Sequence, residues 1–356
     1  MSTPPPPSTA LSVSRGLAGW MQQHRCSLAF TSYQTGQLFL VGTTPAGVVS
    51  FHQQNFQRAM GLHVRPNRLY LGALHQIWRL ENMLAPDQLA NEHHDRLFVP
   101  RNAQTVGDVD IHEVAVDRGG RLVFVNTKYS CLATVSPTHS FQPIWKPPFI
   151  SRLAPEDRCH LNGLAMEDEA PAYVTAVSRS DVLTGWRNRR HEGGVIVDVR
   201  TDRILTDQLS MPHSPRIHDG QLWALDSGRG HLIRVDRDTG ASEIVAFCPG
   251  FLRGLAFHGP YALVTVSLPR HEATFTGLEL ADTLAAKDAD PWCGVFIVDT
   301  RTGDTVEWIR LEGAITELFD IGAMPGAACP MAIGVDSPEM QTMISFDPDF
   351  GPLVSC

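Results

Sequence analysis

The sequence predicts an all-β protein that folds as a single β-propeller of four-stranded antiparallel blades. One pattern recurs along the chain: a short apolar strand, a tight polar turn and a second apolar strand, as in HEVAVDRGGRLVFVN from His112 and RGLAFHGPYALVTVS from Arg253. Several copies are followed by a further hairpin with a D-x-x-T-G turn or a close variant, as in GVFIVDTRTGDTVEWI from Gly294. Four strands that repeat about every 40 to 60 residues, without intervening helices, are typical of propeller blades.

Counting the first strands of the repeats predicts seven blades. These strands begin near Ser27, Met60, His112, Asn162, His213, Arg253 and Glu317. Six blades is the alternative, in which the segments from Ser27 and Glu317 belong to one blade that joins the terminal strands and closes the ring. Residues 1–15 begin with MSTPPPPSTA and predict a disordered proline-rich tail, and residues 16–356 form the propeller domain.

Composition excludes several classes of function. The chain carries 29 Lys and Arg against 38 Asp and Glu, and its basic residues cluster only at Arg187, Arg189 and Arg190, which argues against binding nucleic acid. No apolar stretch approaches the ~18 residues that cross a membrane, and no basic segment precedes a hydrophobic block at the N-terminus. We therefore expect a cytoplasmic protein without membrane contact. The seven scattered cysteines lack CxxC spacing and are expected to be reduced, mostly buried thiols. Composition does not fix the oligomeric state.

Five segments spread over the chain carry a resemblance: YQTGQLF, DIHE, HLNGLA, MPHSPR and FCPGFLRGLAF. They resemble a conserved family of bacterial propeller proteins without an assigned function. The HLNGLA strand more distantly resembles the lactonase, strictosidine-synthase and NHL-type six-bladed propellers. In the lactonase branch an Asn in a matching N-G-L strand is a metal ligand, so this resemblance implies a ligand role for Asn162. The positions at Ser214 and Met60 depart from that pattern, which argues against a copied calcium site.

Polar side chains recur where the first strands begin. In a propeller these strands line the central channel, and their N-terminal ends meet at one mouth. Alignment of the first strands puts Glu113, Asn162, Ser214, Arg253 and Glu317 at one level, with His112 and His213 one residue earlier and His160 further back. Such groups are costly to bury without partners, so their convergence predicts a functional site at this mouth.

The histidines predict a metal centre. His112, His160 and His213 come from three successive blades and could bring neutral imidazole nitrogens together around a divalent transition metal. Iron or copper is favoured, and zinc or calcium is the alternative. The competing interpretation is that each ring hydrogen-bonds nearby backbone as a structural histidine. By contrast, His93 and His94 lie in a polar connection, NEHHDR, which predicts exposure rather than metal binding.

The remaining candidates complete a catalytic hypothesis. Glu113 and Glu317 are predicted to act as further metal ligands or in proton transfer, or else to pair with Arg253. Arg253 has the donor geometry to anchor a carboxylate or phosphate, and Asn162 and Ser214 are candidate substrate contacts. We therefore expect a metal-dependent enzyme acting on a small acidic substrate or peptide, with an iron or copper oxidoreductase favoured. A metal-assisted hydrolase, lactonase or lyase is one alternative. A propeller that binds a ligand or protein without catalysis is another.

Overall fold

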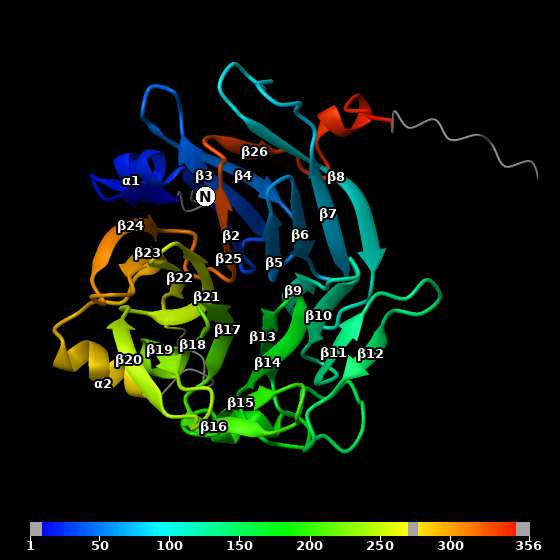
Figure 1. Cartoon of the computed structure of the whole chain (residues 1–356), viewed down its shortest axis with the longest axis vertical. Helices are drawn as coiled ribbons and strands as arrows, with labels where there is room; N and C mark the ends of the chain where they lie inside the picture. The colour runs from blue at the N-terminus through cyan, green and yellow to red at the C-terminus, as the bar shows by residue number, and fades with distance from the viewer. Residues whose placement is uncertain (1–8, 270–276, 347–356) are drawn as a thin grey trace, which may run out of the picture.

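Six β-sheets stand in a ring around a central axis (Figure 1). The computed structural model describes residues 9–269 and 277–346. Each sheet runs outward from an innermost strand near the axis to an outer strand at the rim. Neighbouring strands within a sheet are antiparallel, except for one short strand that pairs in parallel with β8. The all-β propeller predicted from the repeated hairpins is therefore confirmed.

The first three blades make up one half of the ring. From the innermost strand outward, the first blade holds β25 (Ile321–Pro325), β2 (Cys26–Ser32), β3 (Gln37–Thr43) and β4 (Val49–Asn55). The second holds β5 (Leu62–Arg65), β6 (Arg68–Gly72), β7 (Gln76–Asn82), β8 (Arg96–Thr105) and the parallel strand β26 (Pro330–Ala332). The third holds β9 (Ile111–Val116), β10 (Leu122–Asn126), β11 (Cys131–Thr134) and β12 (Gln142–Trp145).

The other half of the ring follows the same plan. The fourth blade holds β13 (Leu161–Glu167), β14 (Ala170–Ala176), β15 (Gly194–Asp198) and β16 (Ile204–Leu209). The fifth holds β17 (Pro212–His218), β18 (Gln221–Asp226), β19 (His231–Val235) and β20 (Ser242–Phe247). The sixth holds β21 (Phe251–His258), β22 (Tyr261–Ser267), β23 (Cys293–Asp299), β24 (Thr305–Glu312) and, at the rim, β1 (Ala10–Val13).

The apolar runs in the sequence become the contacts between blades. Every residue of β9 and β10 is buried, whereas the rim strand β12 of the same blade is partly exposed. A strand such as β10 (LVFVN) is buried on both faces because each blade is covered by its two neighbours, so apolar residues follow one another instead of alternating with polar ones. Six apolar clusters fill the six interfaces between neighbouring blades. Each fully buried aliphatic side chain contributes about 1.5–3 kcal/mol to folding.

The number of blades is six, so the favoured prediction of seven is wrong and its alternative is right. Strand β2 pairs with β25 from Cys26 opposite Pro325 to Phe30 opposite Ile321. The segments from Ser27 and Glu317 are therefore the second and first strands of one blade. Counting repeats along the sequence counts this blade twice, because its strands come from the two ends of the ring.

Part of the predicted tail, residues 1–15, forms a strand. Residues Ala10–Val13 form β1, which pairs with β24 from Ala10 opposite Glu312 to Val13 opposite Ile309. This pairing satisfies the backbone N–H and C=O groups at the outer edge of the sixth blade. Proline content alone does not predict this pairing. Residues 1–8 of the predicted tail lie outside the described residues.

Two α-helices and three short 3-10 helices accompany the blades in the described ranges. Helix α1 (Leu17–His24) buries Leu17, Trp20 and Met21 against the interface between the sixth and first blades. Helix α2 (Glu279–Ala286) lies at the rim of the fifth and sixth blades (Figure 1). The 3-10 helices are Gly185–Arg189, Ser227–Arg229 and Pro338–Gln341. None of the described helices has the length and apolar character needed to cross a membrane.

Candidate functional site

An irregularity recurs near the start of the innermost strand in four successive blades. In β9, β17 and β21, two residues of the innermost strand stand opposite one residue of the next strand, and β13 carries one extra residue. The residues in these bulges are His112 and Glu113, Asn162, Ser214 and Pro215, and Arg253 and Gly254. Bulges change the direction of side chains and are frequent beside active sites. The predicted site residues of these blades therefore lie at or next to positions where the strand is irregular.

Two of the three predicted histidines share one local structure. Asp110 and Met211 have left-handed backbone conformations, with φ of 58° and 48°, and each precedes its histidine by two residues. The ring Nδ1 of His112 lies 3.1 Å from the Asp110 carbonyl oxygen, and that of His213 lies 2.8 Å from the Met211 carbonyl oxygen. The left-handed turn thus places the backbone carbonyl oxygen of the residue two positions earlier beside ring Nδ1. This contact fixes the orientation of the imidazole ring. DIHE and MPHSPR are two copies of this arrangement.

The hydrogen bonds also fix where the proton of His112 resides. Its Nδ1 lies 2.8 Å from Thr127 Oγ1, whose own hydrogen is donated to the Leu161 carbonyl oxygen at 2.6 Å. Both oxygens near Nδ1 therefore accept, so Nδ1 carries the proton and Nε2 keeps its lone pair. Burial lowers the pKa of His112 to about 4, despite the opposing field of Asp110. At neutral pH this imidazole is uncharged.

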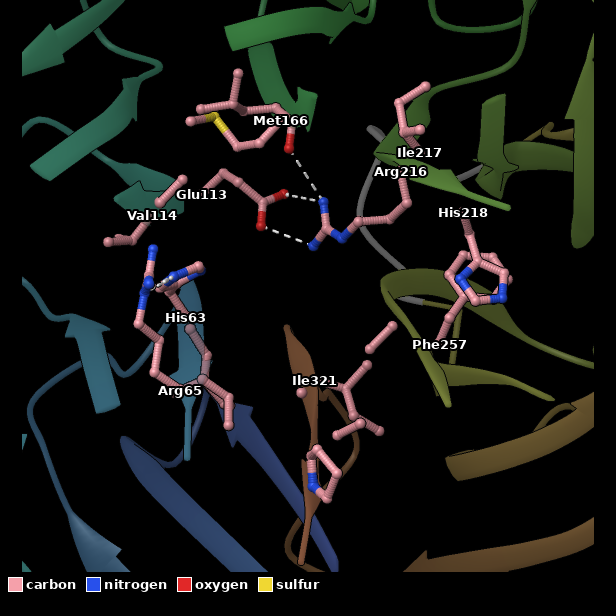
Figure 2. A pocket seen from close by; sticks show the side chains of 18 of the residues that line it. His63, Arg65, Glu113, Val114, Met166, Arg216, Ile217, His218, Phe257 and Ile321 are labelled. Carbon is pink, nitrogen blue, oxygen red and sulfur yellow. Dashed lines mark hydrogen bonds and ion pairs between the residues drawn. The ribbon is translucent and has the colours of Figure 1, made fainter. Parts of the chain in front are cut away.

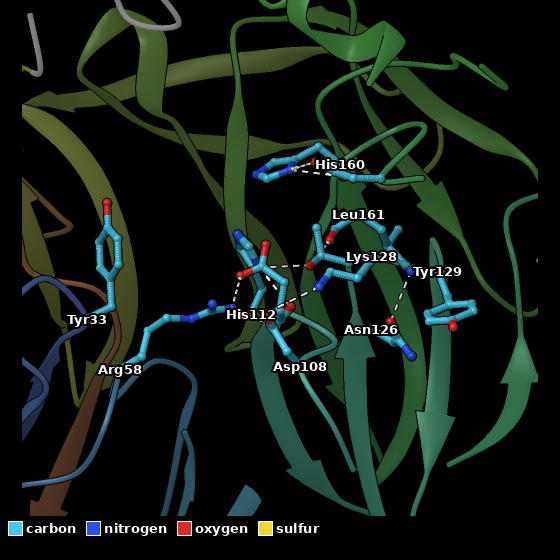
Figure 3. A network of polar contacts seen from close by, with 12 residues as sticks. Tyr33, Arg58, Asp108, His112, Asn126, Lys128, Tyr129, His160 and Leu161 are labelled. Carbon is cyan, nitrogen blue, oxygen red and sulfur yellow. Dashed lines mark hydrogen bonds and ion pairs between the residues drawn. The ribbon is translucent and has the colours of Figure 1, made fainter. Parts of the chain in front are cut away.

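His160 is held by a carboxylate instead of a carbonyl. Its Nδ1 lies 3.0 Å from the Asp157 carboxylate, which also accepts a hydrogen bond from the Trp186 indole at 2.8 Å. The imidazole packs on the Trp186 ring, with centroids 4.3 Å apart, and its centroid is 4.9 Å from that of His112 (Figure 3). Two imidazoles from neighbouring blades therefore meet, and each has its Nδ1 occupied by an oxygen acceptor.

His213 faces a cation. The Arg253 guanidinium donates from Nη1 to His213 Nε2 over 3.2 Å, so the lone pair of this ring already has a partner. Burial and the field of Arg253 lower the pKa of His213 well below its usual value. Among the residues that the structure describes, the potential ligand atoms of His112, His160 and His213 do not all come within 4.8 Å of one another. His112 and His160 therefore lie together, whereas His213 is hydrogen-bonded to Arg253.

Arg253 is a buried cation surrounded by aromatic rings. Its exposure is 8 %, and its guanidinium carbon lies 4.9 Å from the ring centre of Phe251 and 5.4 Å from that of Phe319. Desolvation lowers the pKa of Arg253 to about 10, so it stays charged at neutral pH. Its Nε is buried without a hydrogen-bond partner, and within the described part of the chain no carboxylate forms an ion pair with it.

The acidic groups near this end of the axis are engaged elsewhere. The Asp110 carboxylate receives a hydrogen bond from Arg58 at 2.8 Å (Figure 3). The Glu317 carboxylate accepts the Tyr33 hydroxyl. The predicted ion pair between Arg253 and a glutamate is therefore not formed, although the field of Glu317 does reach the guanidinium.

Glu113 lies in a different environment from His112, which contradicts the prediction that it joins the histidines. Its carboxylate makes two hydrogen bonds to Arg216 in β17, at 2.8 and 3.1 Å. The same guanidinium lies 3.6 Å from Asp320, whose carboxylate accepts the backbone N–H groups of Leu62 and Ile321 at 2.7 and 2.8 Å. Consecutive residues of a strand project in different directions, and here Glu113 meets Arg216 while His112 meets His160.

This network joins three alternate blades across the axis, through β9, β17 and the segment just before β25. Two carboxyl groups face one guanidinium, so burial and mutual repulsion raise the pKa of Asp320 well above its usual value. Burial also raises the pKa of Glu113, against the field of Arg216. A carboxyl group that keeps its proton in this network leaves the buried cluster neutral.

A cavity of about 430 Å³ lies beyond this network, toward the ends of the innermost strands (Figure 2). Its wall is mostly apolar and includes Val114, Met166, Ile217 and Phe257, with Glu113 and Arg216 on its inner side. We call it the exit chamber, and we call the opposite end, at His112, His160 and Arg253, the entry mouth. The predicted acid Glu113 therefore borders the exit chamber, and the predicted acid Glu317 lies at the entry mouth.

The other predicted substrate contacts bond within the protein. The Ser214 hydroxyl donates to the Arg253 carbonyl oxygen at 2.8 Å and links two blades. The side-chain Oδ1 of Asn162 accepts a hydrogen bond from the Thr175 hydroxyl at 2.7 Å, while the Asn162 Nδ2 atom is buried without a partner in the described residues. Sequence reasoning misses Arg216 and Asp320. The MPHSPR segment offers a signal for Arg216, since this segment already supplies His213.

The family model for a domain of unknown function, DUF4915, matches residues 15–333. The chain belongs to the DUF4915 family. This match spans all five segments on which the resemblance to a propeller family without an assigned function rests, and it confirms that resemblance. No curated protein matches the DUF4915 chain.

Two solved structures extend the comparison to the fold. A chain in a crystal structure of a nidogen/laminin complex is 11 % identical, with a TM-score of 0.53, covering 85 % of this chain and 99 % of that one. A protein of unknown function from Bacteroides caccae is 8 % identical, with a TM-score of 0.49, covering 84 % of this chain and 98 % of that one. At such identities the first likeness concerns the fold alone.

Proposed function

We propose that this DUF4915 protein is an enzyme that binds a small acidic molecule, or the carboxylate of a peptide, at the entry mouth. The observation that carries this proposal is the buried guanidinium of Arg253, with which no carboxylate of the described residues pairs. A charge removed from water is costly unless it is paired, and the nearby carboxylates already have other donors. A carboxylate ligand would supply the missing partner through charge-assisted hydrogen bonds.

The two imidazoles beside the anchor supply a chemical role. His112 and His160 keep Nδ1 in contact with protein oxygens, and the neutral His112 ring presents an unprotonated Nε2. Such a nitrogen accepts a proton from a hydroxyl or amine of a bound acid, or from an acidic C–H beside its carboxylate. This favours the hydrolase or lyase alternative, with Arg253 orienting the substrate and His112 as the general base.

A second candidate is the metal-dependent enzyme expected from the sequence. Metal-binding histidines almost always donate the other ring N–H to a carboxylate or carbonyl oxygen, and His112 and His160 do so. The donor set fits two imidazole ligands, with the remaining positions left to water or substrate, because His213 accepts from Arg253. Imidazole nitrogen suits iron, copper or zinc better than calcium. A bound iron or copper would supply the redox chemistry of an oxidoreductase.

Binding of small acids tests the role of Arg253. Arg253→Lys keeps the charge but loses the planar fork, so we expect about 10- to 100-fold weaker binding of the best ligand, equivalent to about 1.5–3 kcal/mol. The ligand is sought by calorimetric titration with 2-hydroxy, 2-oxo and 2-amino carboxylates and inorganic phosphate. Arg118→Lys, at an exposed turn where the arginine bonds a backbone carbonyl, is the matched control. Equal affinity in Arg253→Lys and the parent would contradict the proposal.

Metal analysis separates the two candidates. For the metal-dependent enzyme we expect stoichiometric iron or copper in protein purified without a histidine tag, and at least a tenfold loss of that metal in His112→Ala and His160→Ala. The exposed His139→Ala variant is the control. Metal content that is unchanged in both variants would remove the metal-dependent candidate. Tight carboxylate binding without turnover would favour a binding protein over an enzyme.

A further inference from the structure

A second group of histidines lies at the rim, away from the entry mouth. His93 and His94 belong to the connection between β7 and β8, and Cys329 immediately precedes β26. The parallel pairing of β26 with β8 brings these two segments together, and Figure 1 shows β26 beside the second blade. The sequence predicts exposure for both histidines, but His94 is 8 % exposed and Cys329 is 1 % exposed.

A tight turn directs the two consecutive histidines to the same side. Asn91 and Glu92 have left-handed conformations, with φ of 46° and 69°. Ala90 and His94 close the turn with two backbone hydrogen bonds of 2.9 Å. In an extended strand adjacent side chains would point apart, but in this turn the rings of His93 and His94 lie side by side, with centroids 4.2 Å apart and planes tilted by 38°.

The thiol is positioned against these rings. Cys329 Sγ lies 3.4 Å from His94 Nδ1. The Asp95 carboxylate accepts the backbone N–H groups of Ala328 and Cys329 at 2.9 and 2.7 Å, which fixes the segment carrying the thiol. One potential ligand atom from each of His93, His94 and Cys329 lies within 4.8 Å of the other two. Among the described residues, no other set of His, Cys, Asp and Glu meets this criterion.

We propose that His93, His94 and Cys329 bind Zn²⁺. One thiolate and two imidazoles form a donor set that zinc takes in tetrahedral geometry, with bonds of about 2.3 Å to sulfur and 2.0–2.1 Å to nitrogen. A cavity of about 380 Å³, lined by His93 and Asp95 among others, lies beside the cluster. Water or a small ligand in this cavity provides the fourth donor. The ion joins the β7–β8 connection to the segment before β26.

Binding requires the Cys329 proton to leave, since the thiolate is the ligand. Zinc therefore competes with a proton for the sulfur, and its affinity increases with pH. The two imidazoles bind through the lone pairs of their neutral rings. One proton is therefore released to solvent for each zinc ion bound, and no oxidant or reductant takes part.

Cobalt titration of the metal-free full chain tests the site. Co²⁺ reports both a bound thiolate, by a near-ultraviolet charge-transfer band, and tetrahedral coordination, by visible absorption. We expect one thiolate-bound Co²⁺ per chain with both signals, its displacement by Zn²⁺, and loss of the charge-transfer band in Cys329→Ser. Cys131→Ser, a buried cysteine in the third blade, is the matched control and should keep the band.

Two further variants separate this site from its neighbours and from misfolding. His93→Ala changes a partly exposed residue and should fold normally, yet it should bind Zn²⁺ at least about 100-fold more weakly. His112→Ala, at the entry mouth, should leave the charge-transfer band unchanged, because no thiolate takes part in that site. A charge-transfer band that persists in Cys329→Ser, or zinc affinity that is unaffected in a folded His93→Ala protein, would overturn the proposal.

Discussion

Replacing Arg216 by methionine is expected to lower the free energy of unfolding by about 3–5 kcal/mol, the usual cost of breaking a buried ion pair. Arg216 is the cation that the buried Glu113 and Asp320 carboxyls face, and Glu113 is bonded to it through both oxygens. Methionine fills a similar volume but leaves these groups unpaired across three blades. Denaturant-induced unfolding, followed by circular dichroism and tryptophan fluorescence, measures the loss.

A double substitution separates the ion pair from general packing. Glu113→Gln removes the charge that Arg216→Met leaves unpaired, so the double variant should be more stable than Arg216→Met alone by about 1–3 kcal/mol. Arg118→Met at an exposed turn should change stability by no more than about 0.5 kcal/mol. If Arg216→Met proves as harmless as Arg118→Met, the cross-axis network does not hold the blades together.

The same network explains why Glu113 is a poor candidate for chemistry at the entry mouth. It borders the exit chamber and is bonded to Arg216, whereas Arg253 and the imidazoles lie at the opposite end. A substitution at Glu113 should therefore affect stability far more than carboxylate binding. Of the two acids predicted from the sequence, only Glu317 shares the environment of Arg253.

The fold is predictable because every repeat carries the pattern of a blade. Each hairpin of the ring has its own apolar strands and turn, so the blade pattern can be recognised without knowledge of distant contacts. The convergence of His112, His160 and Arg253 follows from the same regularity, since all first strands begin at one end of the axis. The blade count depends instead on the pairing of β2 with β25, which joins the two ends of the ring.

The partners of the site residues are not predictable from the sequence, because they depend on the bulges. One extra residue changes which face of the strand a side chain occupies, and the bulges fall at His112 and Glu113, at Asn162 and at Arg253. Simple alternation along the sequence therefore does not predict which residues of such a strand share a face. Alternation already separates Glu113 from His112, but the sequence does not show that its partner across the axis is Arg216.

Lowering the pH from 7.5 to 5 is expected to remove about 4 kcal/mol of stability through His63 and His112 together. Burial is the main cause that lowers the pKa of each from 6.5 to about 4 in the folded chain. Between these values the unfolded chain binds more protons than the folded chain, so acid favours unfolding. His213 acts in the same direction, and Asp320, whose pKa is raised, acts in the opposite one.

One imidazole can be isolated by comparing the pH dependence of two proteins. His63 borders the exit chamber, and its Nε2 accepts a hydrogen bond from Arg65 at 3.3 Å, which a glutamine oxygen can replace. His63→Gln should therefore lose about 2 kcal/mol less than the parent between pH 7.5 and 5, whatever the other groups contribute. Denaturant-induced unfolding at a series of pH values measures how the free energy of unfolding changes with pH in the parent and in His63→Gln. Parallel slopes would show that His63 binds its proton equally well in the folded and unfolded chains, because only a difference in proton binding couples its titration to folding.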